Sequence, residues 1–138
     1  MAKGWEAGPG PLALLACAPG ERHTLGLVCF GLVLAERGWR IAYLGADTPV
    51  DQIAAMSASL SPAAVVLCSL APQSLTAEAG ALADLGRDHH TILAGRGVTA
   101  ALAGGLGAHP GEGDPVTTAQ ALADRPPPPA PAARRAAR

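Results

Sequence analysis

One short stretch of this chain combines residue types that could bind a metal. Between Pro19 and Gly26 it places Glu21 two residues before His23 and Gly26 three residues after it. A neutral imidazole nitrogen is a common metal ligand, and a nearby carboxylate can fix its tautomer and raise its basicity. A glycine has no side chain, so a large group can approach it closely. The E-x-H-x-x-G pattern is short, however, and a histidine in such a loop is more often an ordinary surface residue. Whether this histidine is a ligand or a surface residue depends on the strands and helices around it.

These elements alternate between strand and helix patterns. Strands are predicted over apolar runs at 12–17, 40–44, 64–68 and 91–94, with a short fifth strand at 107–109. Helices are predicted over 23–37, from Asp47-Thr48-Pro49 to residue 60, and over 74–87, 98–103 and 116–123. In the second helix either Asp47 or Thr48 is expected as the N-cap.

This alternation predicts an α/β fold: a flavodoxin-like (Rossmann-like), doubly wound, five-stranded parallel sheet of order 2-1-3-4-5. Ligands bind such sheets at the carboxyl ends of the strands, where the first and third strands meet. The loops expected there are 19–26 and 69–74, with 95–97 beside them. The Glu21–His23 pair therefore lies where this fold binds ligands.

Composition narrows the function classes. The chain has 138 residues, 49% of them hydrophobic, and a formal net charge of -1. The length predicts a single domain, which the strand and helix patterns place at 11–124. Residues 1–10 are expected to be a linker, and the Pro/Ala/Arg composition of 125–138 predicts a disordered tail. The composition and net charge argue against direct nucleic-acid binding, and no apolar run reaches the ~18 residues of a membrane span. Three cysteines in apolar runs, with no signal peptide, favour reduced thiols in the cytoplasm, and His89, His90 and His109 are expected to be surface residues.

The motifs together resemble the cobalamin-binding domain. That family carries D-x-H-x-x-G after the first strand, S-x-L after the third and G-G after the fourth. Here the corresponding segments are Glu21 to Gly26, Cys68-Ser69-Leu70 and Gly95-Arg96-Gly97. The closest resemblance is to MerR-type, light-responsive transcriptional regulators, which typically carry G-E-x-H-x-x-G and Y-L-G-x-D-T-P. The second motif stands here as Tyr43 to Pro49, and the resemblance covers residues 11–124.

The resemblance implies a role for each matched residue. His23 would be the lower axial ligand of cobalt in a base-off cobalamin, either adenosylcobalamin or methylcobalamin, and Glu21 would hold its other nitrogen. Gly26 would leave room beneath the corrin ring. The displaced nucleotide tail would lie between the sheet and the helices predicted at 23–37 and 116–123. It would be lined by Cys68, Ser69, Leu70, Gly95 and Gly97, with Tyr43, Gly45, Asp47 and Thr48 near the corrin edge. Cys68 and Ala94 depart from the family's serine and glycine.

Three functions remain open. The first is a cobalamin-binding sensory domain, part of or partner to a MerR-type regulator, acting through a DNA-binding and helix-bundle module or a homo-oligomer. The second is a corrinoid carrier component of a methyltransferase or mutase. The third is a flavodoxin-like domain that binds flavin or nothing; flavin binding predicts a Ser/Thr/Gly-rich loop after the first strand, which this chain lacks. No nucleophile–base pair or carboxylate dyad stands out, so the chain is not expected to be an enzyme.

Overall fold

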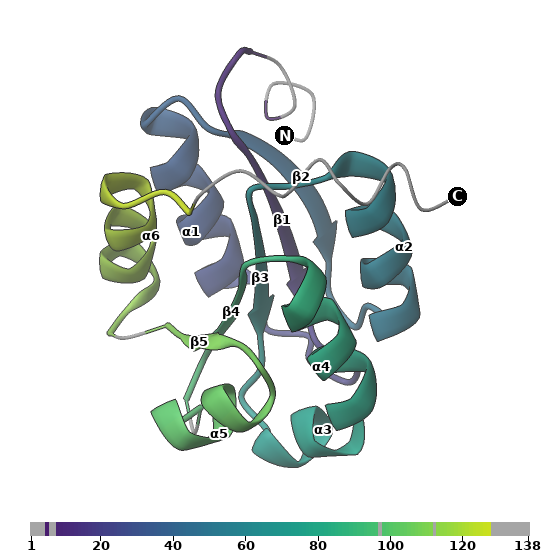
Figure 1. The fold of residues 1–138 in the computed structure, drawn as a ribbon. Coiled ribbons are helices and arrows are strands. Elements are labelled where there is room, and N and C mark those ends of the chain that lie inside the picture. The colour runs from purple at the N-terminus through teal and green to yellow at the C-terminus, as the bar shows by residue number, and fades with distance from the viewer. Residues whose placement is uncertain (1–4, 6–7, 97, 112, 128–138) are drawn as a thin grey trace.

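The computed structural model describes residues 5, 8–96, 98–111 and 113–127. Its centre is a five-stranded parallel sheet of order β2-β1-β3-β4-β5 (Figure 1). The strands are β1 (Leu12–Cys17), β2 (Arg40–Gly45), β3 (Ala64–Cys68), β4 (Thr91–Ala94) and β5 (His109–Pro110). The helices are α1 (Leu25–Glu36), α2 (Val50–Leu60), α3 (Pro72–Ala77), α4 (Ala79–Asp88), α5 (Ala100–Gly105) and α6 (Pro115–Asp124). The predicted fold class and strand order are confirmed.

Each face of the sheet has its own core. Helices α1 and α6 cover one face, through side chains such as Leu27, Phe30 and Leu122. Helices α2, α4 and α5 lie on the other face (Figure 1), where Ile53 and Leu82 pack against the strands. Because successive strand residues point to opposite faces, β1 supplies both cores and is buried along its whole length. This burial explains why its sequence is a continuous apolar run.

The first helix begins later than the sequence predicts. It starts at Leu25 instead of His23, because the backbone N–H of His23 donates to the carboxylate of Glu21 (3.0 Å). The predicted helix over 74–87 is two helices, separated at Glu78, whose φ of -107° and ψ of 20° leave the helical region. Its apolar spacing continues across the break, so periodicity alone could not reveal it.

The second helix is capped differently from the prediction. Its N-cap is Pro49, and neither Asp47 nor Thr48 caps it. The Asp47 carboxylate accepts a hydrogen bond from the backbone N–H of Gly20 (2.7 Å), and the Thr48 hydroxyl donates to the carbonyl of Gly45 (3.1 Å). Both side chains instead brace the loops that follow β1 and β2.

The described part of the N-terminal segment packs on the domain. The backbone carbonyl of Trp5 accepts a hydrogen bond from Ile41 on the edge strand β2 (2.5 Å), and its indole meets the Tyr43 ring edge-on with centroids 5.8 Å apart. Most of the tail predicted at 125–138 lies outside the described residues. Among the described helices, none has the length and apolar character that a membrane crossing requires.

Candidate functional site

The loops at the carboxyl ends of the strands are joined by backbone hydrogen bonds. The N–H of Ala18 donates to the carbonyl of Cys68 (2.9 Å), and that of Ser69 donates to the carbonyl of Ala94 (2.9 Å). The N–H of Asp47 donates to the carbonyl of Glu21 (2.8 Å). These bonds connect the loops after β1, β2, β3 and β4, so the side chains on them are held in fixed relative positions.

Glu21 is the buried anchor of this region. It is 6% exposed, and its carboxylate accepts two backbone hydrogen bonds: Oε1 from the N–H of His23 (3.0 Å) and Oε2 from the N–H of Leu70 (2.8 Å). The same Oε1 lies 2.8 Å from Nδ1 of the His23 ring. One side chain therefore ties the loop after β1 to the loop after β3 and orients the imidazole.

The protonation of this pair follows from its contacts. Burial by itself raises the pKa of Glu21, but the N–H donors of His23 and Leu70, together with the His23 ring, outweigh it and lower that pKa. The carboxylate is therefore ionised at neutral pH, so Nδ1 of His23 must carry the proton that it shares. The His23 side chain is 81% exposed, so its Nε2, on the side of the ring away from Glu21, is accessible to a ligand. A carboxylate that holds one ring nitrogen while the other stays accessible is the arrangement common for a metal-bound histidine.

A cavity of about 440 Å³ opens beside His23. It lies between α1 and α6 on one side and the ends of β3 and β4 on the other, and its volume is typical of a small-molecule site. Its lining residues are His23, Gly26, Leu27, Phe30, Val66, Cys68, Leu70, Ala94, Gly95, Arg96, Gly113, Asp114, Pro115 and Thr118.

Two glycines keep this region open. A Cβ on Gly26 would lie 3.2 Å from Cγ of Pro115, so a side chain there would fill the space between α1 and α6. Gly95 has a φ of +121°, and a Cβ on it would lie 2.0 Å from the backbone oxygen of Ser69. Only glycine allows this close contact between the loops after β3 and β4.

The structure brings together part of the predicted site. His23, Gly26, Cys68, Leu70 and Gly95 line the cavity, and Glu21 lies behind His23. The remaining predicted residues that the structure describes do not line it: Tyr43, Gly45, Asp47, Thr48 and Ser69. The hydroxyl of Ser69 is engaged within its own turn, donating to the carbonyl of Ala71 (3.0 Å). Gly97 lies outside the described residues.

The resemblance placed the tail against the helix that is seen here as α6, but the residues at the start of this helix that line the cavity were missed. Asp114, Pro115 and Thr118 line the cavity although they are more than 85 residues from His23 along the chain. The doubly wound topology was the available signal, because it places the last helix beside the first on one face of the sheet. Arg96 was also missed; it is the cation of the loop after β4 and lines the cavity.

Two thiols lie beneath the site. Cys17 on β1 is the register partner of Cys68 on β3. Burial raises the pKa of Cys17 to about 11, and the neighbouring Cys68 and Glu21 add to that rise. Burial also raises the pKa of Cys68, with a further contribution from Glu21. Both thiols are therefore protonated at neutral pH and are poor nucleophiles.

Three exposed apolar side chains lie on or next to residues that line the cavity. Leu25 at the start of α1 is 77% exposed, Leu70 after β3 is 42% exposed, and Val116 at the start of α6 is 41% exposed. Each of them lines the cavity or adjoins a residue that does. A histidine nitrogen surrounded by exposed apolar groups suits a broad ligand that carries its own metal ion. Among the described residues, no group of three or more His, Cys, Asp or Glu side chains is arranged to hold a metal ion.

Comparison with known structures identifies the fold. The chain superposes on a cobalamin-binding protein from Desulfitobacterium hafniense DCB-2 with a TM-score of 0.74 and 20% identity, over 82% of this chain and 58% of that one. The fold is shared with cobalamin-binding proteins. The methanol:cobalamin methyltransferase complex MtaBC of Methanosarcina barkeri matches with a TM-score of 0.72 and 16% identity, over 92% and 52%. The monomethylamine corrinoid protein of the same organism matches with a TM-score of 0.74 and 17% identity, over 89% and 62%.

Comparison of sequences finds a match to a transcriptional regulator. The chain is 43% identical over 58 residues to the HTH-type transcriptional repressor CarA of Myxococcus xanthus. The match spans 42% of this chain but only 20% of the repressor, and this chain spans little more than half of each solved structure. No family model matches the chain. The predicted resemblance to cobalamin-binding domains of transcriptional regulators is confirmed.

Proposed function

We propose that this chain is a cobalamin-binding domain in which His23 is the lower ligand of cobalt. The observation that carries the proposal is the buried carboxylate of Glu21, which holds Nδ1 of the exposed His23 at 2.8 Å beside a cavity of about 440 Å³. A metal-bound histidine is commonly oriented by a carboxylate in this way. When bound, the corrinoid would supply the metal chemistry.

The residues of the chain fit the parts of such a ligand. His23 offers Nε2 to the metal, while the exposed apolar side chains beside the cavity suit the broad face of a corrin ring. The cavity between α1 and α6 suits the displaced nucleotide tail, because Gly26 leaves space between the two helices. Arg96 on the cavity wall offers a cation for the phosphodiester that joins the tail to the ring.

We propose a sensory role within, or in partnership with, a transcriptional regulator of the MerR type. The match to the CarA repressor, 43% identical over 58 residues, supports this role. A second candidate is a corrinoid carrier for a methyltransferase, which the likeness to the monomethylamine corrinoid protein and the MtaBC complex favours. In either role the chain holds a cofactor instead of catalysing a reaction, and a cytoplasmic location suits both.

Binding can be tested directly. The purified chain is incubated in the dark with adenosylcobalamin or methylcobalamin, and absorbance is recorded after gel filtration. The parent chain should retain cobalamin with a base-off spectrum, whereas His23→Ala should lose most of it. His109→Ala serves as the control, because His109 is on β5 and does not line this cavity. Equal retention and an identical spectrum in His23→Ala would show that His23 is not the ligand.

The two roles differ in their response to light. A light-responsive sensory domain loaded with adenosylcobalamin should change its elution volume after illumination, because the upper ligand controls assembly with other copies or modules. A carrier should keep its elution volume and should instead accept or donate a methyl group when mixed with a corrinoid methyltransferase. Unchanged elution together with methyl exchange would favour the carrier.

A further inference from the structure

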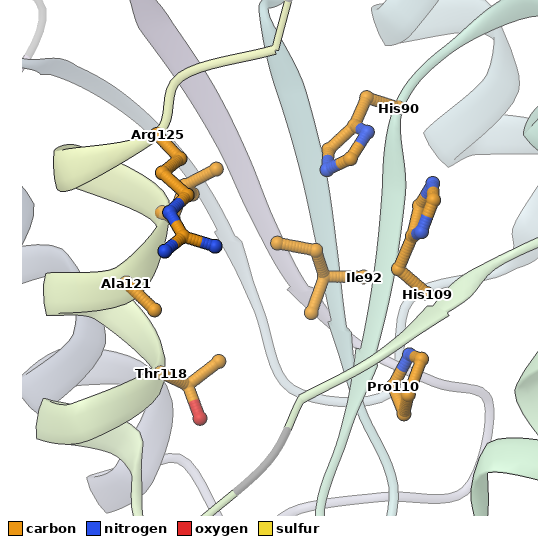
Figure 2. Close-up of a pocket in the computed structure, with 8 residues that line it drawn as sticks. His90, Ile92, His109, Pro110, Thr118, Ala121 and Arg125 are labelled. Carbon is orange, nitrogen blue, oxygen red and sulfur yellow. The ribbon is translucent and has the colours of Figure 1, made fainter.

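A second cavity, of about 270 Å³, lies on the same face of the sheet, between α6 and the strands β4 and β5. Figure 2 shows its two walls: Thr118, Ala121 and Arg125 from the α6 side, and His90, His109 and Pro110 from the strand side, with Ile92 between them. Leu122 completes the lining. Thr118 also lines the first cavity, so the two cavities adjoin at α6.

Nitrogen donors gather in this second cavity. The rings of His90 and His109 stack with centroids 4.4 Å apart and planes 26° from parallel. Arg125 lies across the cavity from them, and its guanidinium is directed toward the space between α6 and the strands (Figure 2). No aspartate or glutamate is among the lining residues. Both histidines were expected to be surface residues; the structure makes His90 half-buried, whereas His109 is exposed.

Arg125 is unusual among the arginines that the structure describes. Arg22, Arg37 and Arg87 each pair with an aspartate, and Arg40 donates to the carbonyl of Gly10. Within the described part of the chain, Arg96 and Arg125 are the arginines without a hydrogen-bonded or ion-paired partner, and each of these two lines a cavity. A guanidinium that converges with two imidazoles on a cavity without carboxylates creates a region that favours negative charge.

We propose that His90, His109 and Arg125 form a binding site for an anionic group, a phosphate or carboxylate, carried by a small molecule. The guanidinium supplies planar paired N–H donors, and each imidazole supplies at least one more. The apolar wall of Ile92, Ala121 and Leu122 can cover the non-polar part of such a ligand. A metal cation is a poor alternative for the two histidines, because the charge of Arg125 in the same cavity opposes it.

The state of the histidines agrees with this site. Burial lowers the pKa of His90, and the neighbouring His109 lowers it further. His90 is therefore mostly neutral at pH 7 when the cavity contains no anion. An anion between the rings and Arg125 favours the protonated imidazole of His90 and should raise its pKa. The titratable and charged groups that line the cavity are His90, His109 and Arg125.

The test uses inorganic phosphate and the full chain without cobalamin. Phosphate is titrated at constant ionic strength while the ring proton signals of His90 and His109 are followed by NMR. We expect saturable shifts of both signals and a higher pKa for His90. Arg125→Gln should weaken phosphate binding about tenfold or more, as expected for loss of a charge-assisted hydrogen bond. Arg87→Gln is the matched control, because Arg87 pairs with Asp84 on the exposed face of α4 and should change nothing.

Other outcomes would overturn the proposal. The NMR shifts could fail to saturate, or they could be equal in Arg125→Gln and Arg87→Gln. Either result would mean that phosphate acts only as a general electrolyte. If Arg125→Gln does not fold, His109→Gln should show the same weakening. A parallel titration with acetate distinguishes the two ligand groups: tighter phosphate binding assigns a phosphate ligand, and tighter acetate binding a carboxylate. His23→Ala should bind phosphate normally, so failure of cobalamin binding and failure of this site are separable.

Discussion

At the scale of single residues, the Glu21 carboxylate links fold and site. It is buried, and its two oxygens accept N–H groups from the loops after β1 and β3. We expect Glu21→Gln to lower the free energy of unfolding by about 1–3 kcal/mol at pH 7, because an amide replaces an ionised acceptor and leaves a buried donor poorly paired. The same change should weaken cobalamin retention, since the amide holds the His23 ring less firmly. Chemical unfolding and gel filtration measure the two effects.

The same residue predicts a pH dependence. The pKa of Glu21 is lowered in the folded chain, so its contribution to stability is complete above its unfolded pKa of about 4.3 and is lost as the pH falls toward the folded value. Urea unfolding between pH 7 and pH 3 should therefore show a shallower loss of stability in Glu21→Gln than in the parent. The pKa of Asp114 is also lowered, by hydrogen bonds from Thr117. Asp114→Asn is the control variant. It should keep the part of the pH dependence of the unfolding free energy that Glu21 contributes.

Cys68 tests the placement of the nucleotide tail. It lines the cavity, and it stands where the cobalamin-binding domain family has a serine. A thiol is a weak hydrogen-bond donor. Cys68→Ser should hold or improve cobalamin affinity, because a hydroxyl donates a stronger hydrogen bond. Equilibrium titration followed by absorbance measures the affinity, and circular dichroism confirms the fold. A folded Cys68→Ser that no longer binds would place the tail elsewhere.

At the scale of elements, the loop after β4 depends on a single backbone conformation. A side chain on Gly95 would meet the Ser69 carbonyl and would strain a φ of +121°. Gly95→Ala should therefore destabilise the chain by about 2 kcal/mol or more, through strain and a forced shift between two loops. Gly104→Ala is the matched control: Gly104 is in α5 with open space around it, and alanine there should stabilise by up to about 1 kcal/mol. Thermal unfolding of the two variants should move the melting temperature in opposite directions.

The bounds of the strands could be predicted from the sequence better than the ends of the helices. The bounds predicted for the first, third and fourth strands are those of β1, β3 and β4, because buried parallel strands are continuous apolar runs between turn residues. Helix ends were less predictable, since they depend on contacts between distant segments. The Glu21 carboxylate, bonded to Leu70, keeps His23 out of α1, and the contact of Asp47 with Gly20 removes it as a cap for α2. No local pattern contains those contacts.

At the scale of the whole molecule, the position of the site and the helix that covers it were predicted, but the residues of that helix that line the cavity were not. Topology places the loop of His23 at the carboxyl edge between β1 and β3, as alternating strands and helices require. The cavity also needs α6, which lies at the far end of the sequence. Packing of α6 against α1 can be inferred only after the strand order is known. The second cavity, which holds Arg125 and the stacked histidines, arises from the same late helix and was not predicted.

The whole-molecule charge leads to a prediction about DNA. The chain has a formal net charge of -1, and half of the described arginines pair with aspartates of the chain itself. Affinity for DNA comes mainly from cations that neutralise phosphates, and sequence is read by elements that enter a groove. We therefore expect no sequence-specific DNA binding by this chain, with or without cobalamin, so a regulatory role would act through a separate DNA-binding module. A gel-shift series with several duplexes at rising salt tests this. Weak binding that modest salt abolishes would reflect only the arginines near the C-terminus, whereas salt-resistant binding that distinguishes one duplex from another would contradict the prediction.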